Sequence, residues 1–144
     1  MNCPFCEIEK EKSRIIFRDD VVMAFPTIIP ITPGHTLICP TRHVSKIDEL
    51  LDTELIEIKK IILRLKKSLE KSFNVEGFNI AWNEGEMAGQ AVEHLHIHIV
   101  PRKIGDKGIY GYDPRKFLYR PGSREESPIK ELEEVANIVR KNLN

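Results

Sequence analysis

Apolar residues recur at helical intervals through the middle of the chain. From Asp52, the expected N-cap, lysines and glutamates separate apolar residues that stand mostly three or four positions apart. These residues are Leu55, Ile58, Ile62, Leu65, Leu69 and Phe73. The pattern predicts one long amphipathic helix that packs on a sheet. A second helix is expected to start at Ser127 and Pro128, with Ile129, Leu132, Val135, Ile138 and Val139 on its buried side.

Other segments show the composition and turn signals of strands. The expected strands cover residues 15–17, 21–25, 35–39, 78–82 and 94–100. The first two flank a short acidic turn, which indicates a hairpin. A proline-rich connection precedes the third strand, and a polar, glycine-bearing loop over 83–90 joins the last two. Together these elements predict an α+β fold.

Three of the five histidines occupy alternate positions of the last expected strand: His94, His96 and His98. Because successive strand side chains point to opposite faces, the imidazoles share one face and the apolar residues between them face a core. Desolvating three titratable rings side by side is costly without a ligand, a metal or a solvent-lined cleft. The spacing therefore favours a chemical role over a structural one, and a three-histidine metal centre is one alternative.

Length and charge narrow the classes of function. At 144 residues the chain is expected to form a single domain over 1–144 with a sizeable core. Lysine plus arginine and aspartate plus glutamate both number 22, which gives no indication of nonspecific binding to nucleic acid or membranes. There is no long apolar run, and the polar start of the chain does not look like a signal peptide, so we expect a cytoplasmic protein.

The histidine-bearing segment 89–102 closely resembles the signature of the histidine triad (HIT) superfamily of nucleotide hydrolases and transferases. Segments 33–40 and 83–85 resemble the nucleotide-binding segments of that superfamily and occur in the expected order. The resemblance covers about residues 3–102 and leaves 103–144 as an unmatched arm and helix. It implies an antiparallel sheet of the HIT type, a homodimer, and an enzyme that acts on phosphoanhydride or phosphoramidate bonds.

The resemblance also assigns catalytic roles. His96 matches the nucleophile, and a neutral imidazole nitrogen can attack an α-phosphorus to give a covalent nucleotidyl-histidine. The other ring nitrogen of His96 should then donate to a fixed acceptor such as a backbone carbonyl. His98 matches the residue that contacts the phosphate and the departing group. Gln90 and the backbone at Gly89 are expected to stabilise the charged transition state.

Further positions match nucleotide-binding residues of the superfamily: Thr27, His35 and Asn83. Two departures affect this set, because Thr27 stands where many relatives carry an acidic or amide residue for the ribose, and Ala91 stands where many carry a hydroxyl. The residues that recognise the sugar and make one of the phosphate contacts are therefore not assigned by the resemblance. Asn83 could equally be an ordinary turn residue, and His35 a solvent-facing residue after a Pro-Gly turn.

Two cysteines near the amino terminus, Cys3 and Cys6, form a second constellation. In a reducing compartment this spacing indicates metal or redox chemistry, and one pair supplies half of a tetrahedral zinc site. A zinc-bearing branch of the superfamily completes its site with residues that match His43 and His94. The resemblance thus implies a structural Zn²⁺ and no organic cofactor. Cys39 is expected to be a small buried hydrophobe.

The segment 102–124 holds seven basic and two acidic residues with four interleaved aromatics. Guanidinium groups bind phosphate and aromatic rings stack on bases, so this arm is expected to clamp the distal part of a dinucleoside polyphosphate. The alternative is a surface loop that packs on its own domain or on a partner subunit.

The motif segments look most like the branch of the superfamily that cleaves dinucleoside polyphosphates. This resemblance implies substrates of the diadenosine tri- or tetraphosphate type, cleaved at the α-phosphate. A nucleoside phosphoramidate is the alternative substrate. A zinc-stabilised nucleotide-binding module with incidental turnover is the alternative class. The motifs leave open the base, the number of phosphates, and whether water or orthophosphate accepts the nucleotide.

Overall fold

The computed structural model describes residues 2–106 and 126–143. Within these ranges, five strands form one sheet in the order β1-β2-β3-β5-β4, and every neighbouring pair is antiparallel. The strands are β1 (Phe17–Arg18), β2 (Val22–Pro26), β3 (Thr36–Pro40), β4 (Gly77–Ala81) and β5 (Ile97–Arg102). The α+β prediction is confirmed. The basic and aromatic arm lies outside the described residues from position 107 onward.

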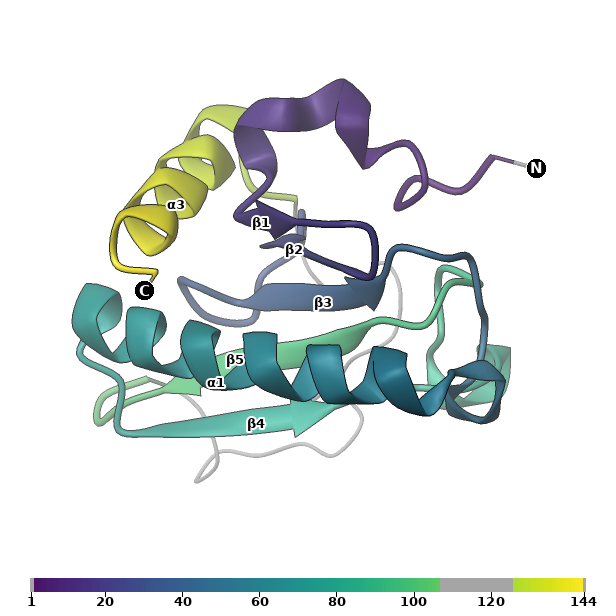
Figure 1. Cartoon of the computed structure of the whole chain (residues 1–144). Coiled ribbons are helices and arrows are strands. Elements are labelled where there is room, and N and C mark those ends of the chain that lie inside the picture. The colour runs from purple at the N-terminus through teal and green to yellow at the C-terminus, as the bar shows by residue number, and fades with distance from the viewer. Residues whose placement is uncertain (1, 107–125, 144) are drawn as a thin grey trace.

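The two predicted helices are both present. They are α1 (Asp52–Phe73) and α3 (Ile129–Lys141), and three short 3-10 helices accompany them: η1 (Ile8–Arg14), η2 (Ile47–Glu49) and η3 (Glu86–Ala88). Helix α1 runs along one face of the sheet, while α3 lies beside η1 near β1 and β2 (Figure 1). No helix in the described ranges is long and apolar enough to cross a membrane.

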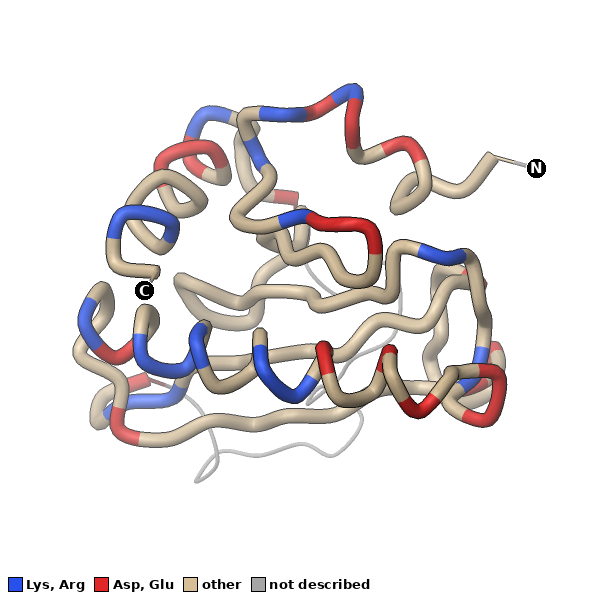
Figure 2. Tube along the Cα trace, in the orientation of Figure 1, with Lys and Arg blue, Asp and Glu red and all other residues tan. Residues whose placement is uncertain are grey.

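Helix α1 starts as predicted, but its N-cap is Leu51 and Asp52 is its first helical residue. Glu54 explains the difference, because its Oε1 accepts the Leu51 backbone N–H at 2.8 Å. Acidic residues gather near the start of α1 and basic residues toward its end, which complements the helix dipole (Figure 2). The helix ends at Asn74 in the left-handed conformation, with φ of 52°.

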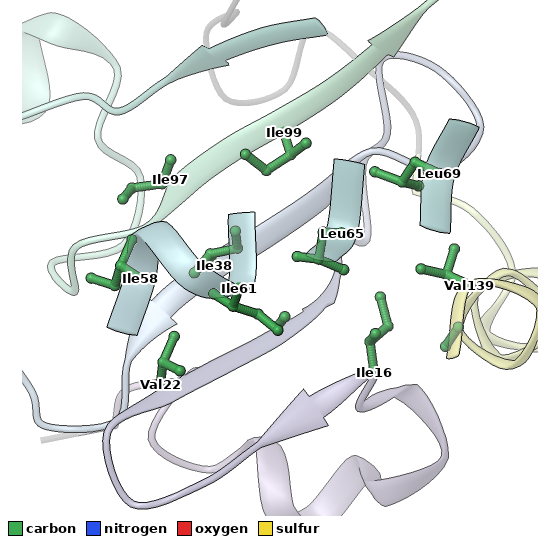
Figure 3. Close-up of a cluster of buried hydrophobic side chains, with 12 residues drawn as sticks. Ile16, Val22, Ile38, Ile58, Ile61, Leu65, Leu69, Ile97, Ile99 and Val139 are labelled. Atoms are coloured by element: carbon green, nitrogen blue, oxygen red, sulfur yellow. The ribbon is translucent and has the colours of Figure 1, made fainter. Parts of the chain in front are cut away.

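The main apolar core lies between α1 and the sheet. From α1, Ile58, Ile61, Leu65 and Leu69 pack toward Ile38, Ile97 and Ile99 of the central strands (Figure 3). Two residues predicted on buried helix faces are instead about half exposed, Leu55 at 48% and Ile129 at 52%. Leu55 lies on the flank of α1, and Ile129 opens the first turn of α3, so neither faces the core directly.

The opposite face of the sheet is covered by the amino-terminal segment. Cys3, Phe5 and Ile8 form a second buried cluster with Met23, Phe25, Leu37 and Cys39 of the sheet. Cys39 is fully buried, as expected for a small hydrophobe. His98 lies on this face, because it is paired with Leu37. His94 and His96 lie there too, because both rings contact Phe5 of the same cluster.

The strand predicted over 94–100 begins later than expected, at Ile97. Pairing with β3 extends from Thr36 opposite Ile99 to Ile38 opposite Ile97 and stops there. Before that point the Leu95 N–H donates to the Val44 carbonyl at 2.7 Å. Residues 94–96 therefore bond to loops rather than to the ladder, and the first two histidines stand at the entrance of β5. The other strand boundaries differ from the predicted ones by one to two residues.

Candidate active site

The ring of His96 is held by the backbone two residues earlier. Its Nδ1 lies 2.7 Å from the carbonyl oxygen of His94. A carbonyl oxygen can only accept, so Nδ1 carries the proton, and in the neutral ring Nε2 carries the lone pair. Burial lowers the pKa of His96, with the bond to the His94 carbonyl acting in the opposite direction. The neutral ring is thereby favoured, and its Nε2 is suited to nucleophilic attack.

A chain of hydrogen bonds fixes the tautomer of His98. The Ile31 backbone N–H donates to Nδ1 of His35 at 3.0 Å, so that nitrogen must be an acceptor. In neutral His35 the proton is then on Nε2, which lies 3.0 Å from Nδ1 of His98. His35 donates there, and the proton of neutral His98 is therefore on Nε2. Nε2 of His98 is thus a hydrogen-bond donor, as a contact to phosphate requires.

The catalytic candidates form one group of buried rings. The ring of His96 meets that of His98 edge-on at a centroid distance of 5.1 Å, and His35 meets His98 at 5.2 Å. His35, His96 and His98 are 1%, 6% and 6% exposed. His35 is accordingly no solvent-facing turn residue. The backbone N–H of buried Thr27 donates to the His35 carbonyl at 3.2 Å, and the Thr27 hydroxyl accepts the Ile29 N–H, so Thr27 lies beside the same group.

The four predicted metal ligands come together from three segments of the chain. One ligand atom from each of Cys3, Cys6, His43 and His94 lies within 4.8 Å of the other three. Sγ of Cys3 is 3.4 Å from Nδ1 of His94, and Sγ of Cys6 is 3.2 Å from Nδ1 of His43. This cluster could hold a metal ion. Among the three alternating histidines, His94 joins the thiols while His96 and His98 face each other, which argues against a three-histidine centre.

The hydrogen bonding and the protonation state of His94 suit a cation in this cluster. Nε2 of His94 donates to the Pro40 carbonyl at 2.8 Å, which leaves Nδ1 as the lone-pair atom facing the thiols. Burial also lowers the pKa of His94 and so favours its neutral, ligating form. Desolvation raises the pKa of the Cys6 thiol to about 11, and the nearby Cys3 adds to the shift. A bound cation would reverse that effect, because it stabilises thiolates.

The segment that carries His43 is anchored to the start of α1. Nη2 of Arg42 donates to the Glu54 carboxylate at 2.7 Å and to the Glu49 carbonyl at 2.8 Å. The hydrogen bond from Arg42 lowers the pKa of Glu54, whose side chain is 8% exposed. On the other side of His43, Val44 accepts the Leu95 N–H. These contacts place the exposed His43 ring beside His94, at a centroid distance of 4.8 Å.

The loop 83–90 is closed on itself by Gln90. The side-chain oxygen of Gln90 accepts the Gly85 N–H at 2.7 Å, and its Nε2 donates to the Ser45 carbonyl at 2.9 Å. Gly89 has a positive φ of 92°, and its carbonyl lies 3.5 Å from Nδ2 of Asn83. Nε2 of Gln90 carries two hydrogens, and the Ser45 carbonyl accepts one of them. Gln90 therefore ties the loop to the segment that follows His43.

Two groups that orient the site were not predicted from the sequence. Phe5 packs against the rings of His94 and His96, and the Pro40 carbonyl fixes the tautomer of His94. Phe5 could have been identified from its position between two cysteines, because a turn that brings both thiols to one metal site also brings Phe5 there. A backbone acceptor such as Pro40 leaves no signal in side-chain patterns.

Comparisons with known proteins agree with this geometry. The model of the HIT domain matches residues 9–105. An uncharacterized HIT-like protein of Methanocaldococcus jannaschii is 40% identical over 108 residues, covering 72% of this chain and 81% of the relative. A bis(5'-adenosyl)-triphosphatase of Dictyostelium discoideum is 32% identical over 131 residues, covering 90% and 85%.

The fold has a solved counterpart over nearly its whole length. The crystal structure of a Zn-bound histidine triad family protein from Mycobacterium smegmatis is similar with a TM-score of 0.75 and 28% identity, covering 99% of this chain and 93% of that one. The resemblance first noted in the alternating histidines is confirmed by the sequence match and by the shared architecture. On these grounds, the chain belongs to the HIT domain family.

Proposed function

We propose that this chain is a nucleotide hydrolase or nucleotidyl transferase that cleaves dinucleoside polyphosphates at the α-phosphate through a covalent nucleotidyl-His96. The observation that carries the proposal is the bond from Nδ1 of His96 to the His94 carbonyl, which directs the lone pair to Nε2 of a buried ring. The relative from Dictyostelium discoideum is named as a bis(5'-adenosyl)-triphosphatase, which supports this substrate class.

The proposed reaction has two displacements. Nε2 of His96 attacks the α-phosphorus, and the bond from that phosphorus to the bridging oxygen breaks as the P–N bond forms. The departing nucleotide leaves as an oxyanion, and Nε2–H of His98 supplies a hydrogen bond to it or to the phosphate. In the second step, water or orthophosphate attacks the same phosphorus and releases His96. Splitting one difficult displacement into two easier ones is the catalytic gain.

The remaining predicted residues take binding roles in this proposal. His35 sets the donor on His98, and Thr27 lies beside His35 where the sugar is expected. Gln90, Gly89 and Asn83 shape the loop that approaches the phosphates. Fixed donors of this kind stabilise charge that develops in a transition state.

We also propose that the cluster of Cys3, Cys6, His43 and His94 holds Zn²⁺. Two thiols and two imidazoles are a donor set that zinc prefers, and a similar solved structure is described as Zn-bound. When bound with all four ligands, zinc supplies a structural cross-link that ties the amino terminus to the entrance of β5. The nucleophile itself is an imidazole, so no organic cofactor is needed.

A homodimer is proposed through the edge formed by β4 and α1. Strand β4 is the last in the sheet order, and edge strands present backbone groups to a further strand. Ile80 and Trp82 are both 43% exposed at this edge. Leu55 is on the adjacent flank of α1, the side on which Lys66 lies over the Phe78 ring of β4. Sedimentation of Ile80→Glu should show a monomer where the parent chain shows a dimer, and a parent monomer would refute the proposal.

The cytoplasm is the proposed compartment. The three cysteines form no disulfide. Thiols of this kind persist in reducing surroundings, where they are available to a metal.

The function is tested by turnover and trapping together. Purified protein is incubated with diadenosine triphosphate, diadenosine tetraphosphate or an adenosine phosphoramidate, and the products identify the bond that is cut. Samples quenched without acid are digested and examined by mass spectrometry, with the expected adduct on the peptide that contains His96. His96→Ala should lose both adduct and turnover, while His98→Ala, which retains the nucleophile, should still form the adduct slowly. Turnover by His96→Ala at the parent rate would refute the proposal.

A further inference from the structure

One aromatic side chain links the metal cluster to the proposed nucleophile. Phe5 lies between Cys3 and Cys6 and is 8% exposed. Its ring meets the ring of His96 edge-on, with centroids 5.1 Å apart and planes at 72°. The same ring lies 5.9 Å from the ring of His94 and 5.3 Å from that of Phe25. Phe5 therefore touches both the metal-ligand candidate and the nucleophile.

Phe5 lies in a backbone turn whose two flanking residues are the thiols Cys3 and Cys6. The Glu7 N–H donates to the Cys3 carbonyl at 3.1 Å, and the Ile8 N–H donates to the Phe5 carbonyl at 3.4 Å. These bonds fold the segment 3–8 into a tight turn. Cys3 is 6% exposed, whereas Cys6 is at the surface. If both thiols are held by one metal ion, the backbone between them is fixed at two points, and the ring of Phe5 is held against His96.

The contact with Phe5 restricts the orientation of the His96 ring. The hydrogen bond from Nδ1 to the His94 carbonyl holds one atom of the His96 ring but allows the ring to tilt about that bond. An edge-on aromatic neighbour on one side and the ring of His98, 5.1 Å away, restrict this tilt. The direction of the Nε2 lone pair depends on the tilt, and an attack on phosphorus requires that direction to be aligned.

We propose that Phe5 is a positioning residue for His96, and that through Phe5 the metal cluster controls the alignment of the nucleophile. The inference rests on the proposed nucleotidyl transfer by His96. It gives the metal a role in turnover without any contact between the metal and the substrate.

The test compares Phe5→Ala with Ile8→Ala, both read in parallel with the parent chain. Ile8 is the matched control because it is 2% exposed in the same apolar cluster and carries no aromatic ring. For Phe5→Ala we expect full metal content and unchanged KM, with kcat lower by roughly 10- to 100-fold, as misalignment of a nucleophile produces. Ile8→Ala should keep the kcat of the parent chain.

A second readout does not require turnover. The imidazole signals of His96 are followed by NMR in ¹⁵N-labelled protein without nucleotide, with and without a zinc chelator. Chelation of the parent chain and the Phe5→Ala substitution should both broaden or shift these signals. Chelation of Phe5→Ala should then add little to either effect, because the link is already broken. Phe5→Leu, which retains apolar volume, should fall between the parent chain and Phe5→Ala and serves in its place if the alanine variant does not fold.

Two results would overturn the inference. The first is a variant at Phe5 that has the kcat and the His96 signals of the parent chain. The second is a loss of kcat that, in Phe5→Ala after chelation, equals the product of the two separate losses, as two independent effects would give. If the parent chain cleaves none of the nucleotides, the proposed function fails, but the His96 signals still decide whether Phe5 and the metal position this ring.

Discussion

His35 offers the sharpest test of the hydrogen-bond chain that ends at the phosphate. It is 1% exposed and donates from Nε2 to Nδ1 of His98, which is itself buried. The change His35→Leu removes this donor and the acceptor for the Ile31 N–H. Either tautomer of His98 then has a buried ring nitrogen without its former partner, and the preference for a proton on Nε2 is lost.

The size of the effect follows from the desolvation of that nitrogen. Leaving a buried polar group unsatisfied costs about 1–3 kcal/mol. If this cost falls on the transition state, at 1.36 kcal/mol for each factor of ten it corresponds to a loss of roughly 5- to 150-fold in kcat. His35→Gln retains an amide N–H that can reach toward His98, so it should recover part of the loss.

The assay measures kcat and KM for diadenosine polyphosphate with the parent chain, His35→Leu and His35→Gln. Chemical denaturation of each variant separates a loss of folded protein from a loss of chemistry. The ¹⁵N shifts of His98 report directly which ring nitrogen is protonated. The reasoning is refuted if His35→Leu is fully folded and keeps both the parent kcat and the parent tautomer of His98.

Three further predictions concern the metal and the scaffold. His43→Ala should lower zinc affinity, measured by competition with a chelator, and should lower the thermal midpoint of the zinc-loaded protein, because a metal bound only by the folded state stabilises that state. Leu65→Ala should reduce the free energy of unfolding by about 2–5 kcal/mol in urea titrations, because Leu65 is fully buried between α1 and the sheet. Glu54→Gln should remove a pH-dependent part of stability. Arg42 lowers the pKa of folded Glu54 below the ordinary value of about 4.3, so the stabilisation is present above that pH and is lost as pH falls through the folded pKa. Urea titrations from pH 7 to pH 3 should show the difference between the two chains shrinking toward the acidic end, and a difference that does not shrink would contradict this assignment.

The helices could be predicted because their apolar residues follow the helical period. The start of α1 was located to within one residue, and its buried face differed mainly at Leu55. Periodicity reports which residues share a face, but the width of the covered face depends on what packs there. At the β4 side of α1 the sheet ends, so Leu55 has little to pack against and stays half exposed.

The sequence predicted some parts of the candidate site and left others undetermined, for a different reason in each case. Alternating histidines gave one chemical face, but alternation alone also allowed a three-histidine metal centre. Only the family resemblance separated His94 from its neighbours, and only the structure shows the Pro40 carbonyl that turns its Nδ1 toward the thiols. No spacing rule selects His43, because the loop that brings it to Cys6 is set by contacts such as that of Arg42 with Glu54.

Side-chain alternation predicted a strand from His94, but β5 starts only at Ile97, and the difference has a chemical reason. Had His94 and His96 continued the strand, their carbonyls and N–H groups would be directed to neighbouring strands by the ladder. Because residues 94–96 leave the ladder, the His94 carbonyl is available to accept Nδ1–H of His96, and the Leu95 N–H binds Val44 beside His43. One departure from regular pairing thus orients the nucleophile and joins the metal-ligand segments. A sequence pattern that counts only side chains predicts the longer strand, since the reason to end it lies in the backbone.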